Sequence, residues 1–177
     1  MKVNRIWISI LLVMALSFGF TACANHTPVS ITEPAKSPNP TQQSTPTSAE
    51  LKDVIITLER TACKGTCPVY KLTIYGSGTV VYEGKDYVKT TGNKESGISV
   101  DKIEQILSEF KNIDYFSLHD SYVQRVITDA PSVITSIKVG GETKTIIHYH
   151  GDLNAPDALE ALEDKIDEIV NSDQWIK

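Results

Sequence analysis

Two cysteines in one short stretch are the residues of this chain whose types and spacing best suit chemistry. They lie in Arg60-Thr-Ala-Cys63-Lys-Gly65-Thr-Cys67-Pro-Val-Tyr70, which joins two segments with the pattern of strands. Three residues separate the cysteines, and Gly65 eases a tight turn, so the two sulfur atoms can reach disulfide distance. A disulfide here would fix how the two strands meet. The same pair, if reduced, could act as a redox centre or bind a soft metal ion.

His148 and His150 are the second candidate pair, two positions apart in a segment with the pattern of a strand. Residues two apart in a strand share a face, so both imidazoles could reach one ion. Together with reduced Cys63 and Cys67 they would supply four ligands that zinc or copper accepts. The simpler interpretation needs no cofactor: two polar histidines end a strand beside the turn that starts at Gly151.

The spacing Cys63-x3-Cys67-Pro68 is similar to that of the copper chaperones of cytochrome oxidase, which also use a distant histidine. Those proteins carry the motif on a thioredoxin-like fold, which needs parallel strand-helix-strand units. This chain lacks the pattern of such units. The spacing also differs from the Cys-x2-Cys of thioredoxins and from haem-attachment motifs.

Polar residues in or beside the predicted loops form a third candidate group, because they could line a binding groove. Exposed ion pairs are the simpler account of these residues. His119, Asp120 and Ser121 have the residue types of a hydrolase triad, but adjacent residues point in different directions and the Gly-x-Ser-x-Gly elbow is absent, so we assign no catalytic residue. The groove candidates are Arg60, Tyr70, Asp120, Tyr122, Arg125 and Asp152.

Residues 1–22 predict a targeting signal. Lys2 and Arg5 supply positive charge, an apolar run follows from Ile6 to Phe20, and a small residue precedes Cys23. This is the layout of a secretory signal, and the run is short for a membrane-spanning helix. The ending resembles the lipobox of bacterial lipoproteins, which implies cleavage after residue 22 and lipidation of Cys23. An ordinary cleaved signal that leaves a free thiol at Cys23 is the alternative.

Residues 23–51 predict the lipidated cysteine and a disordered tether. Five prolines alternate with Ser, Thr, Asn and Gln, and large apolar side chains are almost absent. Such a segment cannot bury enough surface to offset the entropy lost on ordering, and its prolines keep it partly extended. We therefore expect one folded domain over residues 52–177, held away from a membrane of the cell envelope.

Composition narrows the class of partner. The 177 residues carry a formal net charge of -5, which argues against nucleic acid because phosphate binding needs a basic face. Hydrophobic residues make up 41% of the chain, which is enough for a packed core in one domain. The partners that we expect are the membrane, through the lipid, and a protein or small molecule that the sequence does not identify.

Alternating apolar residues predict strands that turn back on one another. The predicted strands are Val54–Glu59, Tyr70–Tyr75, Thr79–Tyr82, Tyr87–Thr91, Val133–Val139 and Thr143–His150. Gly76-Ser77-Gly78, Gly84-Lys85 and Gly140-Gly141 are the predicted turns between them. Connections this short join antiparallel strands.

Two segments have the helical pattern. One follows Ser99, a candidate N-cap, and the other starts near Asn154 and Pro156, with an acidic face that we expect to be solvated. The order of elements predicts an α+β fold, in which an antiparallel sheet of about five to six strands carries two helices on one face. The apolar stripes of the helices are Ile103, Ile106, Leu107, Phe110 and Ile113, then Leu159, Leu162, Ile166, Ile169 and Val170.

Three motifs together resemble an uncharacterised bacterial domain, domain of unknown function 6438. They are Arg60-x2-Cys63-x-Gly65-x-Cys67-Pro68-x-Tyr70, Tyr75-Gly-x-Gly78 and His148-Tyr-His150-Gly-Asp152. The resemblance runs from about Val54 onward, and Lys64 stands where we expect the family to have an aromatic residue. It implies a secreted or lipoprotein context and no established activity.

The function that we expect is therefore that of an envelope lipoprotein, a non-catalytic binding or structural module tethered to the membrane. The alternative is a thiol redox protein or a copper- or zinc-binding protein. It would use Cys63 and Cys67 with His148 and His150.

Overall fold

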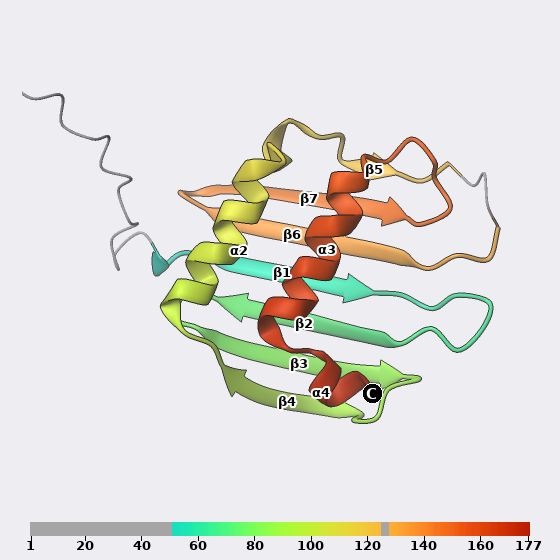
Figure 1. Cartoon of the computed structure of the whole chain (residues 1–177), viewed down its shortest axis with the longest axis horizontal. Helices are drawn as coiled ribbons and strands as arrows, with labels where there is room; N and C mark the ends of the chain where they lie inside the picture. Colours follow the sequence, from blue (N-terminus) through green and yellow to red (C-terminus); the bar gives the residue numbers. More distant parts are fainter. Residues whose placement is uncertain (1–50, 125–127) are drawn as a thin grey trace, which may run out of the picture. The chain divides into compact units, whose positions relative to one another are not determined.

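A computed structural model describes residues 51–124 and 128–177. These residues form an α+β fold, a seven-stranded sheet that carries helices on one face (Figure 1). The predicted signal peptide, Cys23, the tether up to residue 50 and Arg125 lie outside the described residues.

The sheet has the strand order β4-β3-β2-β1-β6-β7-β5. Neighbouring strands are antiparallel, except that the short β5 runs parallel to β7. The strands are β1 (Ile55–Arg60), β2 (Val69–Tyr75), β3 (Thr79–Asp86), β4 (Gly92–Gly97), β5 (Ser121–Tyr122), β6 (Ser132–Val139) and β7 (Glu142–Tyr149).

Two helices, α2 (Val100–Asn112) and α3 (Asp157–Val170), lie side by side on the same face of the sheet (Figure 1). Ser99 is the N-cap of α2, as predicted, although its side chain makes no capping hydrogen bond. A 3₁₀ turn, η1 (Tyr115–Ser117), follows α2, and a short helix, α4 (Asp173–Ile176), ends the chain.

The core lies between this face of the sheet and the two helices. The predicted alternation is confirmed, because every second side chain of β1, β2 and β6 is buried, as on any strand with one covered face. The helical stripes meet these side chains. The fully buried core includes Ile56, Leu58, Leu72, Ile74, Val80, Ile103, Ile106, Val133, Ile146, Leu159 and Ile166.

The predicted strand at Tyr87–Thr91 is wrong, and the fourth strand instead spans Gly92–Gly97. Tyr87 has a φ of 50°, which takes the backbone out of the extended region. The amides of Lys89 and Thr90 donate to the carbonyls of Ile176 and Trp175 rather than to a strand. The true β4 is an edge strand with almost no buried side chain, so it lacks the alternating pattern that predicts a strand.

The expected sheet of about five to six strands with two helices is roughly right: the described residues contain seven strands and the helices α2, α3 and α4. The extra elements are β5 and α4, which have two and four residues. Segments this short cannot show a hydrophobic period that repeats along the chain. No helix in the described part of the chain combines the length and the apolar character needed to cross a bilayer.

Candidate functional site

A row of residues across four strands forms the floor of the candidate site. Tyr70 of β2 pairs with Arg60 of β1, Arg60 pairs with Val133 of β6, and Val133 pairs with His148 of β7. All four lie on the face that the helices cover, because they continue the alternation of the buried core residues. Tyr70, Arg60 and His148 thus bring polar groups to this end of the covered face, with the apolar Val133 between Arg60 and His148.

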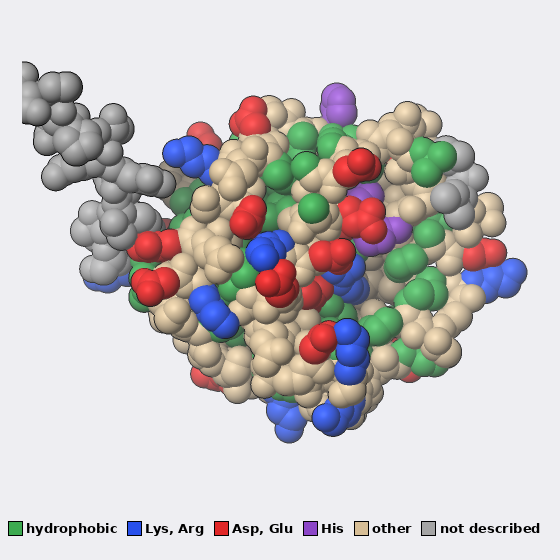
Figure 2. Space-filling view, viewed as in Figure 1, with side chains coloured by type: hydrophobic (Ala, Val, Ile, Leu, Met, Phe, Trp, Pro, Cys, Tyr) green, Lys and Arg blue, Asp and Glu red, His purple; other side chains and the backbone are tan. Residues whose placement is uncertain are grey.

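The acidic side chains of α3 lie above this row. Glu163 is completely buried, the side chain of Asp167 is 16% exposed and that of Asp164 is 68% exposed. Glu163 follows Leu159 by four residues and precedes Ile166 by three, so it belongs to the buried stripe. The expectation of a wholly solvated acidic face is therefore wrong for Glu163 and Asp167. Figure 2 shows histidine side chains among acidic ones on this face of the molecule.

Arg60, Tyr70 and Asp167 form a tight polar cluster. Arg60 Nε donates to Asp167 Oδ2 at 2.8 Å and lies 3.0 Å from the Tyr70 hydroxyl. That hydroxyl donates to the same carboxylate oxygen at 2.7 Å. Arg60 Nη2 also donates to Asp164 Oδ1 at 2.8 Å. The cluster thus ties the ends of β1 and β2 to the second half of α3.

The charges in this cluster shift the pKa values of its members. Burial raises the pKa of the Tyr70 hydroxyl well above its usual value, and the charge of Asp167 raises it further. Burial opposes the charge of Arg60, but the Asp167 carboxylate more than compensates and holds the pKa of the guanidinium above its usual value. Tyr70 is therefore a neutral donor and Arg60 a fixed cation.

A pocket of about 470 Å³ opens beside the cluster. Pro68 and Ile176 contribute apolar surface to its wall. Asp167 Oδ1 is buried, and no described residue donates a hydrogen bond to it. Polar and charged side chains of the wall are Arg60, Tyr70, Asp164, Asp167, Glu168, Asn171, Ser172 and Asp173. The wall thus holds four carboxylates and one guanidinium, and Lys165 and Lys177 pair with two of the carboxylates, those of Glu168 and Asp173.

Glu163 joins the two histidines further along α3. His148 Nδ1 lies 3.0 Å from Glu163 Oε1, and His150 Nε2 lies 3.0 Å from Glu163 Oε2. The two imidazole centroids are 4.6 Å apart. Both histidines thus lie beside the same carboxylate, as expected for two residues two positions apart at the end of one strand. The sequence does not predict that Glu163 lies at this point, because the acidic residues of the last predicted helix are expected on its solvated face.

Hydrogen bonds from the two histidines keep the carboxyl group of Glu163 ionised. Burial opposes the charge of Glu163, yet the hydrogen bonds with His148 and then His150 hold the pKa of its carboxyl below the usual value. The hydrogen bond with Glu163 raises the pKa of His150 against the effect of burial. Glu163 is therefore an ionised carboxylate in the interior.

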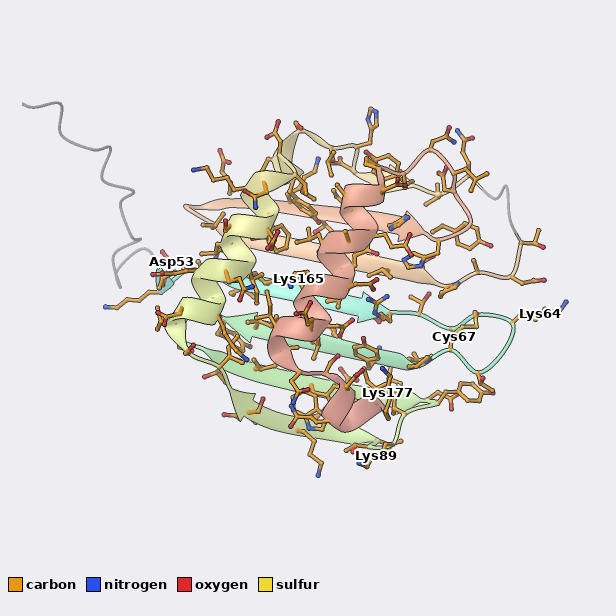
Figure 3. The ribbon with its side chains drawn as sticks, viewed as in Figure 1. Asp53, Lys64, Cys67, Lys89, Lys165 and Lys177 are labelled. Carbon is orange, nitrogen blue, oxygen red and sulfur yellow. A yellow bond between two sulfur atoms is a disulfide. The ribbon has the colours of Figure 1, made fainter. Side chains whose placement is uncertain are left out.

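Cys63 and Cys67 are joined as a disulfide in the loop between β1 and β2, with Cα atoms 5.7 Å apart. Figure 3 shows Cys67 in this loop and Lys64 at its outer end, pointing away from the sheet. Among the described residues, the group of side chains that could hold a metal ion consists of His148, His150 and Glu163. The structure thus gathers the histidines around a carboxylate, and neither cysteine belongs to that group.

The remaining groove candidates lie in separate places. Asp120 forms an ion pair with Lys144, whose hydrogen bond lowers the pKa of the Asp120 carboxyl. Tyr122 is buried beneath His119. Asp152 accepts hydrogen bonds from the amides of Gln124 and Asn154 and so shapes a loop. Of the candidates that the structure describes, only Arg60 and Tyr70 line the pocket.

Comparison with known proteins places the domain in a family. The family model described as "Domain of unknown function (DUF6438)" matches residues 54–170, which include every strand and helix described above except α4. None of the curated proteins compared with the chain matches it. Because the match covers more than half of the chain, the protein belongs to the DUF6438 family.

Proposed function

We propose that this domain is a non-catalytic binding module of the bacterial cell envelope, which binds a primary amine in the pocket beside Arg60 and Tyr70. The observation that carries the proposal is the pocket itself, a concave site of about 470 Å³ with convergent polar groups on its floor. Pockets with these features are the usual location of ligand sites.

The charge of the wall supports a cationic ligand. Arg60 shares its charge with Asp164 and Asp167, while Glu168 pairs with Lys165 and Asp173 pairs with Lys177. Four carboxylates against three cations leave a net negative charge around the opening. An ammonium group offers three donors, and Asp167 Oδ1 is a buried acceptor that no described residue satisfies. The apolar side chains of Pro68 and Ile176 suit the methylene stem of a lysine or a similar amine.

The location that we propose rests on the sequence. The lipobox-like ending at Cys23 and the proline-rich segment that follows support a domain carried outside the cytoplasm on a lipid anchor. In that compartment thiols that can reach each other pair, which suits a structural role for Cys63 and Cys67. A thiol redox function remains the alternative for these two residues.

Binding of a short peptide with one lysine tests the pocket. The full chain should bind Gly-Lys-Gly with an acetylated N-terminus and an amidated C-terminus, in which the lysine side chain is the only primary amine. Calorimetry and NMR shifts of the pocket amides measure this binding. The chain should not bind the same peptide with an acetylated lysine, because acetylation removes the charge. Binding should also weaken as salt is raised, since the carboxylates at the opening are exposed.

Matched aspartate variants locate the binding. Asp173→Asn removes a carboxylate from the wall of the pocket and should weaken binding. Asp101→Asn removes an exposed carboxylate from the first turn of α2, outside the pocket lining, and should leave binding unchanged. Equal affinity for the free and acetylated peptides, or an equal loss in both variants, would refute the proposal.

A further inference from the structure

We propose that His148, His150 and Glu163 bind a divalent transition-metal ion, with zinc as the ion that suits them best. These three residues are called the His-Glu-His site below. It is separate from the amine pocket, whose lining contains none of the three. It also leaves out Cys63 and Cys67, which are paired with each other.

The donor atoms of the His-Glu-His site are already close together. One ligand atom from each residue lies within 4.8 Å of the other two. The carboxylate oxygens of Glu163 lie 3.0 and 3.2 Å from His148 Nδ1, and one of them lies 3.0 Å from His150 Nε2. Zinc bonds of about 2.0–2.2 Å in tetrahedral geometry place ligand atoms roughly 3.3 Å apart. Small side-chain adjustments therefore suffice to bind one ion between them.

The burial of Glu163 argues for a stronger partner than two imidazoles. Its side chain is fully buried at a position of α3 where the neighbours in the stripe, Leu159 and Ile166, are apolar. An ionised carboxylate in such a place is unfavourable unless it is well paired. Two imidazole N–H groups satisfy only part of its acceptor capacity, whereas a divalent ion compensates its charge directly.

The surroundings also match those of metal-binding histidines. Such histidines usually turn their second ring nitrogen toward a carboxylate or a carbonyl, which fixes the tautomer. His150 binds Glu163 through Nε2, and its Nδ1 lies 3.9 Å from Glu160 Oε1. Glu160 is one helical turn before Glu163 on α3, so the same helix supplies a ligand and places a second carboxylate near the other ring nitrogen of His150.

The donor set narrows the class of ion. Two imidazole nitrogens and one carboxylate oxygen suit zinc and its neighbours, and they disfavour calcium or magnesium, which prefer oxygen ligands. Three protein ligands leave one position of a tetrahedral zinc ion for water or another small ligand. His150 is 18% exposed, while His148 and Glu163 are nearly or fully buried, so that position would face the His150 side.

Competition with a chromophoric chelator tests the site on the full chain after treatment with EDTA. The wild-type chain should take up one equivalent of Zn²⁺ and melt at a higher temperature in its presence. Co²⁺ in the same site should give the visible absorption of a four- or five-coordinate ion. Glu163→Gln and His150→Gln should each weaken Zn²⁺ binding by more than about 10-fold and abolish the Co²⁺ spectrum.

His119→Gln is the matched control, because His119 is an exposed histidine that lies outside the His-Glu-His site. It should bind Zn²⁺ as the wild type does. Circular dichroism in EDTA shows whether each variant is folded, and His150→Gln alone decides the test if Glu163→Gln does not fold. The proposal is overturned if the wild type takes up no stoichiometric Zn²⁺, or if the folded His150→Gln variant binds as tightly as His119→Gln.

Discussion

Three tyrosine hydroxyls of the core are held in their neutral form by the fold. Burial raises the pKa of Tyr70, Tyr82 and Tyr115 above the usual value of a phenol. Each hydroxyl also donates a hydrogen bond, to Asp167, to the carbonyl of Thr90 and to the carbonyl of Thr135, respectively. A phenolate could not donate any of these bonds.

Stability should therefore fall in the alkaline range. The unfolded chain ionises its tyrosines near pH 10, while the folded chain keeps these three protonated. The folded state thus binds more protons above that pH. The stabilisation is complete below about pH 10 and is lost as pH rises toward the folded pKa values. Phenolate absorbance should show tyrosines that titrate only together with unfolding.

The variant Tyr70→Phe measures how much of this loss of stability at alkaline pH comes from the cluster of Arg60, Tyr70 and Asp167. Tyr70→Phe should lower the free energy of unfolding at neutral pH, because it removes the donor to Asp167. It should also make the decline above about pH 10 shallower, since one raised pKa is gone. Tyr75→Phe, which removes an exposed phenol from the same strand, is the control. An unchanged slope in Tyr70→Phe would contradict the assignment.

Two glycines in neighbouring segments should respond differently to alanine. A Cβ on Gly76 would overlap the carbonyl of Leu51, whereas one on Gly65 would lie 3.7 Å from Cys63 Sγ, an ordinary contact. Gly65 also has no positive φ, so the turn that this residue is expected to ease does not depend on the conformational freedom of glycine. Urea unfolding should show a loss of about 1–3 kcal/mol for Gly76→Ala. Gly65→Ala should change the free energy by less than about 0.5 kcal/mol, and equal losses would refute this account.

At the scale of elements, the loop between β1 and β2 holds the disulfide and borders the polar cluster at the ends of these two strands. It leaves β1 at Arg60 and enters β2 at Val69, so both of its ends adjoin the polar cluster with Asp167. The amide of Lys64 donates to the carbonyl of Asp129, which links the loop to the segment before β6. The disulfide therefore limits the motion of a loop that borders the pocket.

Loss of the disulfide should destabilise the domain moderately. A closed loop of this size contributes about 2 kcal/mol in the chain-entropy model. The double variant Cys63→Ala, Cys67→Ala should lose about that free energy of unfolding in urea and retain its fold. A structural disulfide also resists reduction by glutathione, which alkylation and intact mass can follow across a redox series. Reduction in the range of glutaredoxins, with no change in melting temperature, would favour the redox function instead.

At the scale of the whole molecule, the sequence predicts that the folded domain is attached to a membrane by a lipid. The lipid would be carried by Cys23 and separated from the domain by the proline-rich segment up to residue 51. Several acyl chains on one cysteine hold a protein on a membrane firmly, whereas one chain binds only marginally. The anchor would thus confine the amine pocket and the His-Glu-His site to the membrane surface.

Cys23→Ser tests the anchor. The wild type should fractionate with membranes and have the mass of an acylated chain that starts at Cys23. The variant should lose the lipid mass and leave the membrane fraction, because serine offers no thiol for acylation. Cys63→Ala, Cys67→Ala is the control for the loss of cysteines as such, and it should stay membrane-bound. A wild-type chain recovered soluble and without lipid would disprove lipidation.

Local regularities in the sequence determined the class of fold. Strands with one buried face have alternating apolar residues, and a helix on a sheet has an apolar stripe, so β1, β2, β6, β7, α2 and α3 could each be predicted from their own residues. Short elements such as β5 and α4 are too short for a period to repeat, and β4 has no buried face to mark it. Contacts with other segments determine them.

The sites depend on contacts that no local pattern contains. The cysteine and histidine pairs could be recognised because their members are close in sequence and share a strand or a loop. The carboxylates that these sites need lie elsewhere in the sequence: Asp167 is 107 residues after its partner Arg60, and Glu163 is 15 residues after its partner His148. A carboxylate in an amphipathic helix can face water or the sheet, and only the packing of α3 across β7, β6, β1 and β2 put Glu163 and Asp167 on the inner side. The residue types were thus evident from the sequence, and tertiary structure decided which of them meet.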